Sequence, residues 1–146
     1  GRVYARSKKT LDGNYRSVYL PIMRSFVPQI LQTFDFAEPS MVKGSRDVTT
    51  VPTQALYLMN NPFVHRQSKN LARILMDKDG LTNAERIDLA YKLALSRAPT
   101  TFEAIRSLTY LKSFQDRNEK GSNPDLNALA SLCHALFSVA EFRYLN

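Results

Sequence analysis

Residues 123–140 read NPDLNALASLCHALFSVA, and this stretch decides the fold class. Pro124 suits the first position of a helix, because the amide hydrogen it lacks would have no partner there, and Asn123 before it is an expected N-cap. Apolar residues then recur every three or four positions and form one wide stripe: Leu126, Leu129, Ala130, Cys133, Leu136, Phe137 and Ala140. We therefore predict a helix over residues 124–140 at the centre of a helical bundle.

Three more helices are predicted upstream of this one, over residues 62–76, 83–97 and 101–118. The first opens on Asn61-Pro62, and the other two open on capping boxes, Thr82 with Glu85 and Thr100 with Glu103. The residues expected to face the core are Phe63, Val64, Leu71, Ile74 and Leu75, then Ile87, Ala90, Tyr91 and Ala94, then Ile105, Leu108 and Leu111. The sequence thus predicts an all-α protein, mostly a helical bundle.

Residues 45–63, SRDVTTVPTQALYLMNNPF, form the entry to this bundle. Thr50 or Thr53 is expected to cap a short helix that ends at Asn60, because hydroxyl side chains bond the free amides of a first turn. One side of that helix should carry Ala55, Leu56 and Met59. Pro62 must end it, since proline has no amide hydrogen and clashes with the carbonyl four residues earlier, that of Leu58.

The N-terminal part of the chain differs from the bundle in composition and predicted structure. Residues 1–15 are polar and basic, which predicts a flexible arm. Arg16–Ile22 alternates apolar residues and favours an extended segment, and residues 27–34 can form a short helix with Pro28 in its first turn. We expect residues 16–146 to form a single helical domain, and the opening on a glycine and a basic stretch suggests a piece of a longer protein.

Composition limits the classes of partner. Twenty Lys and Arg against thirteen Asp and Glu leave 146 residues with a net charge of +7, which would suit an acidic partner. The excess is spread along the chain, with no run of adjacent cations beyond Lys8-Lys9, so a solubilising charge is favoured over a nucleic-acid footprint. No apolar run approaches the roughly 20 residues of a membrane span. The single cysteine excludes a disulfide within the chain.

Cys133-His134 is the one pair that invites a cofactor interpretation. Covalent haem attachment uses C-x-x-C-H, but the first cysteine position holds Ala130. Neighbouring helical residues point about 100° apart, so the two side chains do not converge on one metal, and His65 is the only other histidine. We expect a buried thiol beside a surface imidazole, no haem and no metal in this chain, and no complete enzyme active site.

The candidate ligand-binding or interdomain residues come from the entry stretch and the segments before it. They are Arg16, Asp35, Arg46, Thr49, Thr50, Gln54 and Asn60. An arginine fork and several hydroxyl and amide donors match an anionic or sugar ligand. Structural roles are favoured at each position, with Arg46 paired to Asp35 or Asp47 as a partly buried charge, threonines capping a helix, and Gln54 fixing a loop.

Several ordered blocks of the chain carry a resemblance to a known family. The blocks are Arg16–Pro21, Phe34–Phe36, Arg46–Leu56, Asn60–Phe63, Leu95–Thr100 and Glu141–Tyr144. Together they resemble the planctomycete cytochrome-c-associated C-terminal domain of unknown function, over about Arg16 to the end of the chain. The departures are Ser96, where the family usually has glycine, and Ser45, where a second arginine is common.

The resemblance implies a setting more than an activity. Such domains occur in large exported proteins beside haem-bearing cytochrome-c-like modules, which implies a periplasmic or cell-surface location, with any haem in other domains. We interpret the chain as a docking or scaffold domain whose partners are the other domains of its parent protein. Two alternatives stay open: a binding module for anionic or sulfated glycans, and a fragment of an enzyme completed by the upstream region. Nucleic acid is not an expected partner.

Overall fold

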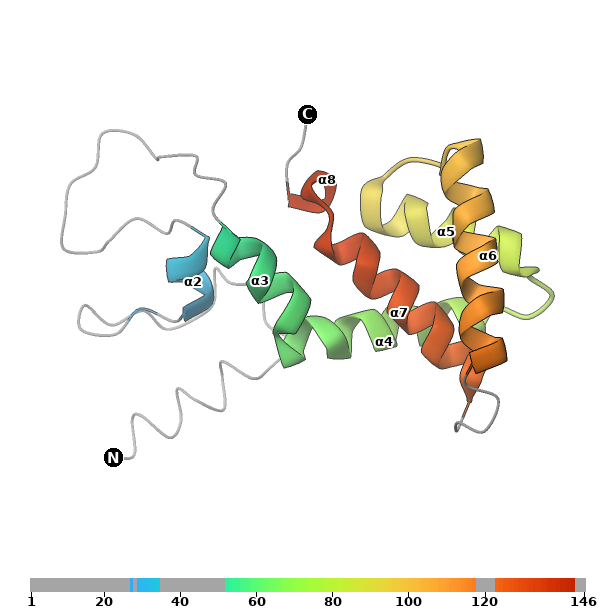
Figure 1. Ribbon diagram of the computed structural model, residues 1–146, viewed down its shortest axis with the longest axis horizontal. Helices are drawn as coiled ribbons and strands as arrows, with labels where there is room; N and C mark the ends of the chain where they lie inside the picture. The colour runs from blue at the N-terminus through green and yellow to red at the C-terminus, as the bar shows by residue number, and fades with distance from the viewer. Residues whose placement is uncertain (1–26, 28, 35–51, 118–122, 144–146) are drawn as a thin grey trace. The chain divides into compact units, whose positions relative to one another are not determined.

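The computed structural model describes residues 27, 29–34, 52–117 and 123–143 (Figure 1). These residues form seven helices and contain no strand, so the all-α fold class is confirmed for the part of the chain that is described. The predicted arm over residues 1–15 and the extended segment Arg16–Ile22 lie outside the described residues. Their structure stays a prediction.

The contacts divide the chain into two compact units, residues 1–57 and 58–146. The first unit contains the short helix α2 (Gln29–Thr33), which confirms the helix expected over residues 27–34, and the first part of α3 (Pro52–Asn60). Within this unit the ring of Phe34 meets that of Tyr57 edge to face, with 5.7 Å between centroids. The second unit begins with the last residues of α3 and is a helical bundle.

The bundle consists of four long helices and one short one. They are α4 (Pro62–Met76), α5 (Asn83–Leu95), α6 (Thr101–Arg117), α7 (Pro124–Ser138) and α8 (Ala140–Arg143). Helix α7 packs against each of the other four, most extensively against α4 (Figure 1). The prediction that this helix lies at the centre is confirmed.

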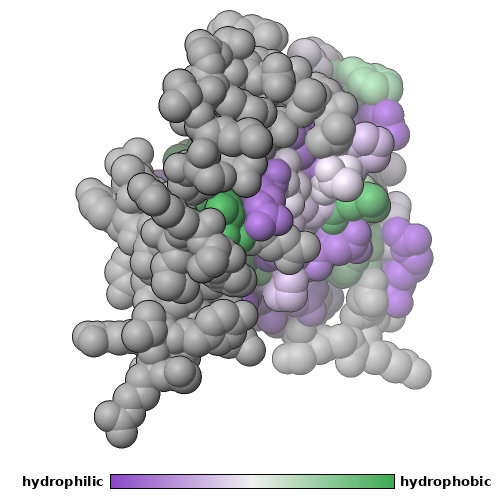
Figure 2. Space-filling model, turned by 90° about the vertical axis from the view of Figure 1, so that its left-hand side faces the viewer, coloured by the Kyte–Doolittle hydropathy of each residue, from purple (hydrophilic) through white to green (hydrophobic). Residues whose placement is uncertain are grey.

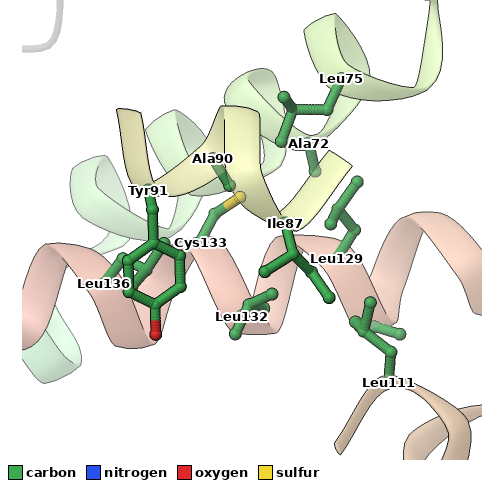
Figure 3. Close-up of a cluster of buried hydrophobic side chains, with 11 residues drawn as sticks. Ala72, Leu75, Ile87, Ala90, Tyr91, Leu111, Leu129, Leu132, Cys133 and Leu136 are labelled. Atoms are coloured by element: carbon green, nitrogen blue, oxygen red, sulfur yellow. The ribbon is translucent and has the colours of Figure 1, made fainter. Parts of the chain in front are cut away.

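The core is built from the apolar stripe of α7 and the helices around it. Figure 3 shows Leu129, Leu132, Cys133 and Leu136 projecting from α7 among side chains of α4, α5 and α6. The full buried cluster is Ala72, Leu75, Ile87, Ala90, Tyr91, Leu111, Ala128, Leu129, Leu132, Cys133 and Leu136. Burying each large aliphatic side chain contributes about 1.5–3 kcal/mol, so this cluster is the main source of the bundle's stability.

The predicted helix starts are largely confirmed at the level of hydrogen bonds. The Asn61 side chain accepts from the Phe63 amide at 2.8 Å, and Thr82 and Glu85 form a complete capping box. Thr100 and Glu103 make the same reciprocal bonds. The N-cap expected at Asn123 is wrong in one respect: it precedes α7, but it has φ 59° and its side chain makes no capping bond.

The predicted helix ends need correction at two places. Helix α5 ends at Leu95 and not at residue 97, because Ser96 is left-handed with φ 58°. Helix α7 ends at Ser138 and not at residue 140, because Val139 is extended with ψ 154°, and Ala140 then begins α8. In the entry stretch, α3 begins at Pro52, so Thr53 lies inside the helix and does not cap it, and Thr50 lies outside the described residues.

Several apolar residues that were expected in the core are exposed instead. Ile74 is 54% exposed and Ile105 58%, and Leu108 is only partly covered. Helix α6 turns Leu111 and Ser107 inward, flanked by the half-buried rings of Tyr110 and Phe114, so the side that bears Ile105 faces away. On α3 the buried residues are Gln54 and Leu58, whereas Leu56 and Met59 are exposed.

The surface of the described residues is mixed in polarity. On the face drawn in Figure 2, hydrophilic and hydrophobic side chains are interspersed among the coloured residues. None of the helices in the described ranges combines the length and the apolar character that crossing a membrane requires.

Candidate functional site

Most of the predicted binding residues lie outside the described part of the chain. These are Arg16, Asp35, Arg46, Thr49 and Thr50, and the proposed pairing of Arg46 with Asp35 or Asp47 lies there too. Gln54 and Asn60 both lie on α3. Gln54 is 4% exposed and Asn60 is exposed. Six helical positions separate them, which turns their side chains roughly 120° apart around α3.

A cluster of charges that the sequence did not single out lies where α5, α6 and α8 meet. The Arg97 guanidinium binds Glu103 through Nη1 and Nη2, both at 2.8 Å. It binds Glu141 through Nε at 2.6 Å and Nη2 at 2.8 Å. Nη1 also donates to the carbonyl of Ala98 at 3.1 Å. These five bonds use all five donors of an arginine, so no donor is left for a ligand.

The electrostatics of this cluster point to a structural role. The hydrogen bonds with Glu103 and then Glu141 raise the pKa of Arg97. Arg97 in turn lowers the pKa of Glu103 to about 2, helped by the Thr100 amide, and lowers the pKa of Glu141. All three groups are therefore charged at neutral pH, and the lowered pKa values of both carboxyls lie away from the range near neutrality that favours general acid–base catalysis.

The cluster also joins two of the sequence blocks that carry the family resemblance. Arg97 belongs to Leu95–Thr100 and Glu141 to Glu141–Tyr144, and the fold brings these blocks together across 44 positions of sequence. The ring of Tyr91, on α5, lies 5.7 Å from the guanidinium carbon of Arg97. Sequence reasoning missed this cluster because nothing local identifies which of many carboxylates an arginine will bind.

The two histidines of the chain form a pair, which the sequence also did not predict. His65 on α4 and His134 on α7 have ring centroids 4.1 Å apart and planes inclined by 35°. His134 is half-buried, so its expected place at the surface is wrong in part, whereas Cys133 is fully buried as expected. Burial raises the pKa of the Cys133 thiol to about 12. A neutral, buried thiol of this kind is a poor nucleophile, because the thiolate is the reactive form.

A proline explains why His134 forms a hydrogen bond with the backbone of α3. Within a helix the carbonyl of Leu58 would accept from the amide of the residue four positions later, which is Pro62 and has no amide hydrogen. Nε2 of His134 lies 3.0 Å from that carbonyl oxygen and supplies the missing donor. The sequence indicates that Leu58 needs a partner, but only the fold shows that the partner comes from α7.

The exposed side of α6 carries two large apolar side chains away from the core. We call Phe102, Ile105, Arg106, Thr109 and Lys112 the α6 outer face, because all five are exposed and lie within about 120° around the helix. Phe102 is 66% exposed and Ile105 58%. The Arg106 guanidinium carbon lies 5.3 Å from the centroid of the Phe102 ring, a cation–π contact that holds both side chains at the surface.

The described residues show no constellation for metal chemistry. Within them, no three His, Cys, Asp or Glu side chains gather closely enough to hold a metal ion. His65 and His134 alone would provide two ligands, where zinc sites in proteins ordinarily use three or four.

Comparison with known families gives a match over most of the chain. Residues 2–111 match the family described as PSD1, protein of unknown function (DUF1553), and they make up most of the 146-residue chain. The chain belongs to the DUF1553 family. The match covers the entry stretch, α4, α5 and α6 as far as Leu111. No curated protein and no solved structure matches the chain.

Proposed function

We propose that this DUF1553 chain is a non-catalytic docking domain, and that it binds other domains of its parent protein through the α6 outer face. The observation that supports this proposal is the exposure of Phe102 and Ile105 on neighbouring turns of one helix. Single exposed apolar residues are normal, whereas neighbouring ones with a polar rim are typical of interaction sites. Phenylalanine and arginine are also enriched in the buried cores of protein interfaces relative to the rest of the surface.

The charges around this face specify the chemistry of the partner. Arg106 and Lys112 border Phe102 and Ile105, so a complementary surface is apolar with an acidic rim. Residues 1–26 of this chain carry six basic residues and one acidic residue, which makes them a poor match. A second copy, face to face, would bring like charges together. The proposal therefore commits to a separate domain with an acidic border.

Three further parts of the proposal rest on the sequence and the resemblance. The chain itself carries no haem and no metal, and haem, where present, belongs to cytochrome-c-like modules of the parent protein. The setting is the periplasm or the cell surface of a planctomycete. The complete use of the donors of Arg97 supports a non-catalytic role, because that arginine cannot bind a substrate anion while it holds both glutamates.

Binding of anionic or sulfated glycans is the second candidate, and a different surface favours it. Arg66, Lys69 and Arg73 recur at i, i+3 and i+7 on α4, and all three are exposed. Such a row of cations can contact successive sulfates or carboxylates. The docking proposal is preferred because it also accounts for the exposed Phe102 and Ile105.

The experiment measures association between this chain and the remaining domains of its parent, by calorimetry at low and at high salt. Replacing an apolar anchor at an interface centre typically costs about 2 kcal/mol, so Phe102→Ser with Ile105→Ser should weaken binding about thirtyfold or more. The matched control is Ile74→Ser, which alters an equally exposed isoleucine on α4. Arg106→Glu should also weaken binding, and the loss of affinity should be larger at low salt than at high salt.

The outcomes separate the two candidates. Loss of association in the α6 variants but not in Ile74→Ser supports docking at the α6 outer face. Equal loss in all variants, or no association at all with the parent's domains, overturns it. Binding to a heparin-like glycan that is abolished by Arg66→Ala with Lys69→Ala and unaffected by Phe102→Ser would instead establish the glycan module.

A further inference from the structure

We propose that the His65–His134 pair is an acid-sensitive clasp, which holds the junction between α3 and α4 against α7 near neutral pH and loosens it when both rings carry a proton. The inference is independent of the docking proposal and concerns a different face of the bundle. Its starting point is the carbonyl of Leu58, which Pro62 leaves without a helical partner.

The hydrogen bond fixes the protonation of one nitrogen. A carbonyl oxygen can only accept, so Nε2 of His134, 3.0 Å from the oxygen of Leu58, must carry hydrogen. In the neutral ring the lone pair is then on Nδ1, and a further proton binds there. A single positive charge on His134 leaves the bond to Leu58 in place and strengthens it, because charged donors make stronger hydrogen bonds.

A second charge has the opposite effect. The two ring centroids are 4.1 Å apart, a separation at which two positive charges repel each other. His65 is exposed and can take up a proton directly from solvent. Moving the rings apart relieves the repulsion, but it also draws His134 away from the carbonyl of Leu58. Imidazole is in general the side chain whose charge responds to a change from neutral to mildly acidic pH.

Among the described residues, the neighbours of the pair on α4, α7 and α3 do not offset the repulsion. On α4 the charged neighbours of His65 are Arg66, one position on, and Lys69, one turn on, and both are cations. On α7 the positions one turn from His134 hold Ala130, Ser131, Phe137 and Ser138, which carry no charge. From α3 the Leu58 carbonyl oxygen contacts the pair, and it accepts a hydrogen bond from His134. No carboxylate in these positions can neutralise a second proton.

The test is amide hydrogen exchange on the full chain at pH 7.5 and pH 5.0, with rates corrected for the direct effect of pH on exchange. The readout is the protection of amides between Leu58 and His65. In the wild type the protection should fall about fivefold or more at pH 5.0, which corresponds to the repulsion of two charges about 4 Å apart in water. Amides of α6 in the same experiment are the internal control and should change little.

Two variants decide the matter. His65→Gln removes one of the two charges, leaves the bond between His134 and Leu58, and replaces an exposed residue, so it should fold and show no such loss of protection. His134→Gln can still donate to Leu58 but cannot be protonated, and it should be equally insensitive. If either variant loses protection at pH 5.0 as the wild type does, or if the wild type does not respond, the clasp proposal is wrong.

Discussion

At the scale of single residues, Ser96 has a backbone conformation that its side chain disfavours. It follows α5 in the left-handed region, with φ 58°, where a side chain approaches the backbone and costs about 1–2 kcal/mol. Helices commonly end on a glycine for this reason. The resemblance described above implies a glycine at this position in related proteins, and a left-handed backbone would favour one there.

We predict that Ser96→Gly stabilises the chain by about 1 kcal/mol, because glycine adopts this conformation without steric cost. Denaturant unfolding measures the change. Gly80→Ala is the matched opposite: Gly80 has φ 79° and an added Cβ would meet no atom within 4 Å, so only the backbone would be strained and stability should fall. Ser96→Gly that proves neutral or destabilising would show that Ser96 makes contacts which outweigh its strain.

At the scale of elements, α8 depends on the rest of the bundle. Four residues cannot form a stable helix alone. Glu141 ties α8 to Arg97, and the ring of Phe142 lies 4.9 Å from that of Phe137 on α7. Arg97 binds Glu103 on α6 at the same time, so one guanidinium holds the start of α6 and the end of the described chain together.

We predict that this cluster makes stability depend on pH below about 5. Both glutamates have pKa values lowered from the ordinary 4.5 in the folded chain, Glu103 to about 2. The stability they contribute is therefore fully present above pH 4.5 and is lost as the pH falls toward 2. Between pH 5 and 2, the free energy of unfolding should vary less with pH in Glu103→Gln than in the wild type. The same should hold for Glu141→Gln.

Asp88→Asn provides the control for this prediction. Asp88 pairs with Lys92 one turn away on α5, an exposed contact of a kind worth about 0.3–0.5 kcal/mol. Its replacement should leave the steep acid dependence in place. An acid dependence that survives in the double variant Glu103→Gln, Glu141→Gln would show that other carboxylates cause it.

At the scale of the whole molecule, Cys133 reports whether the bundle is closed. It is completely buried on the central helix, and burial raises the pKa of its thiol to about 12. We predict that a thiol reagent at pH 8 labels the native chain at least about 1,000-fold more slowly than the denatured chain, since reaction needs the bundle to open. Rapid labelling in native buffer would mean that α7 is not seated in the core.

The sequence by itself determined the helical fold class, the four long helices and most of their starts. Caps and apolar periodicity act within three or four residues, so Thr82 with Glu85 or Asn61 with Pro62 can be recognised without knowing the fold. The same local reasoning predicted that Pro62 ends the helix before it, because proline lacks an amide hydrogen and clashes with the Leu58 carbonyl.

Only the tertiary structure decided which apolar faces are covered and which distant groups meet. Ile105 and Leu111 both fit the periodicity of α6, but packing against α7 buries one of them and leaves the other at the surface. Arg97 meets Glu141 across 44 positions, and His134 meets Leu58 across 76. Such pairs depend on how helices pack in three dimensions, and the spacing of residues along one chain does not encode that packing in any local pattern.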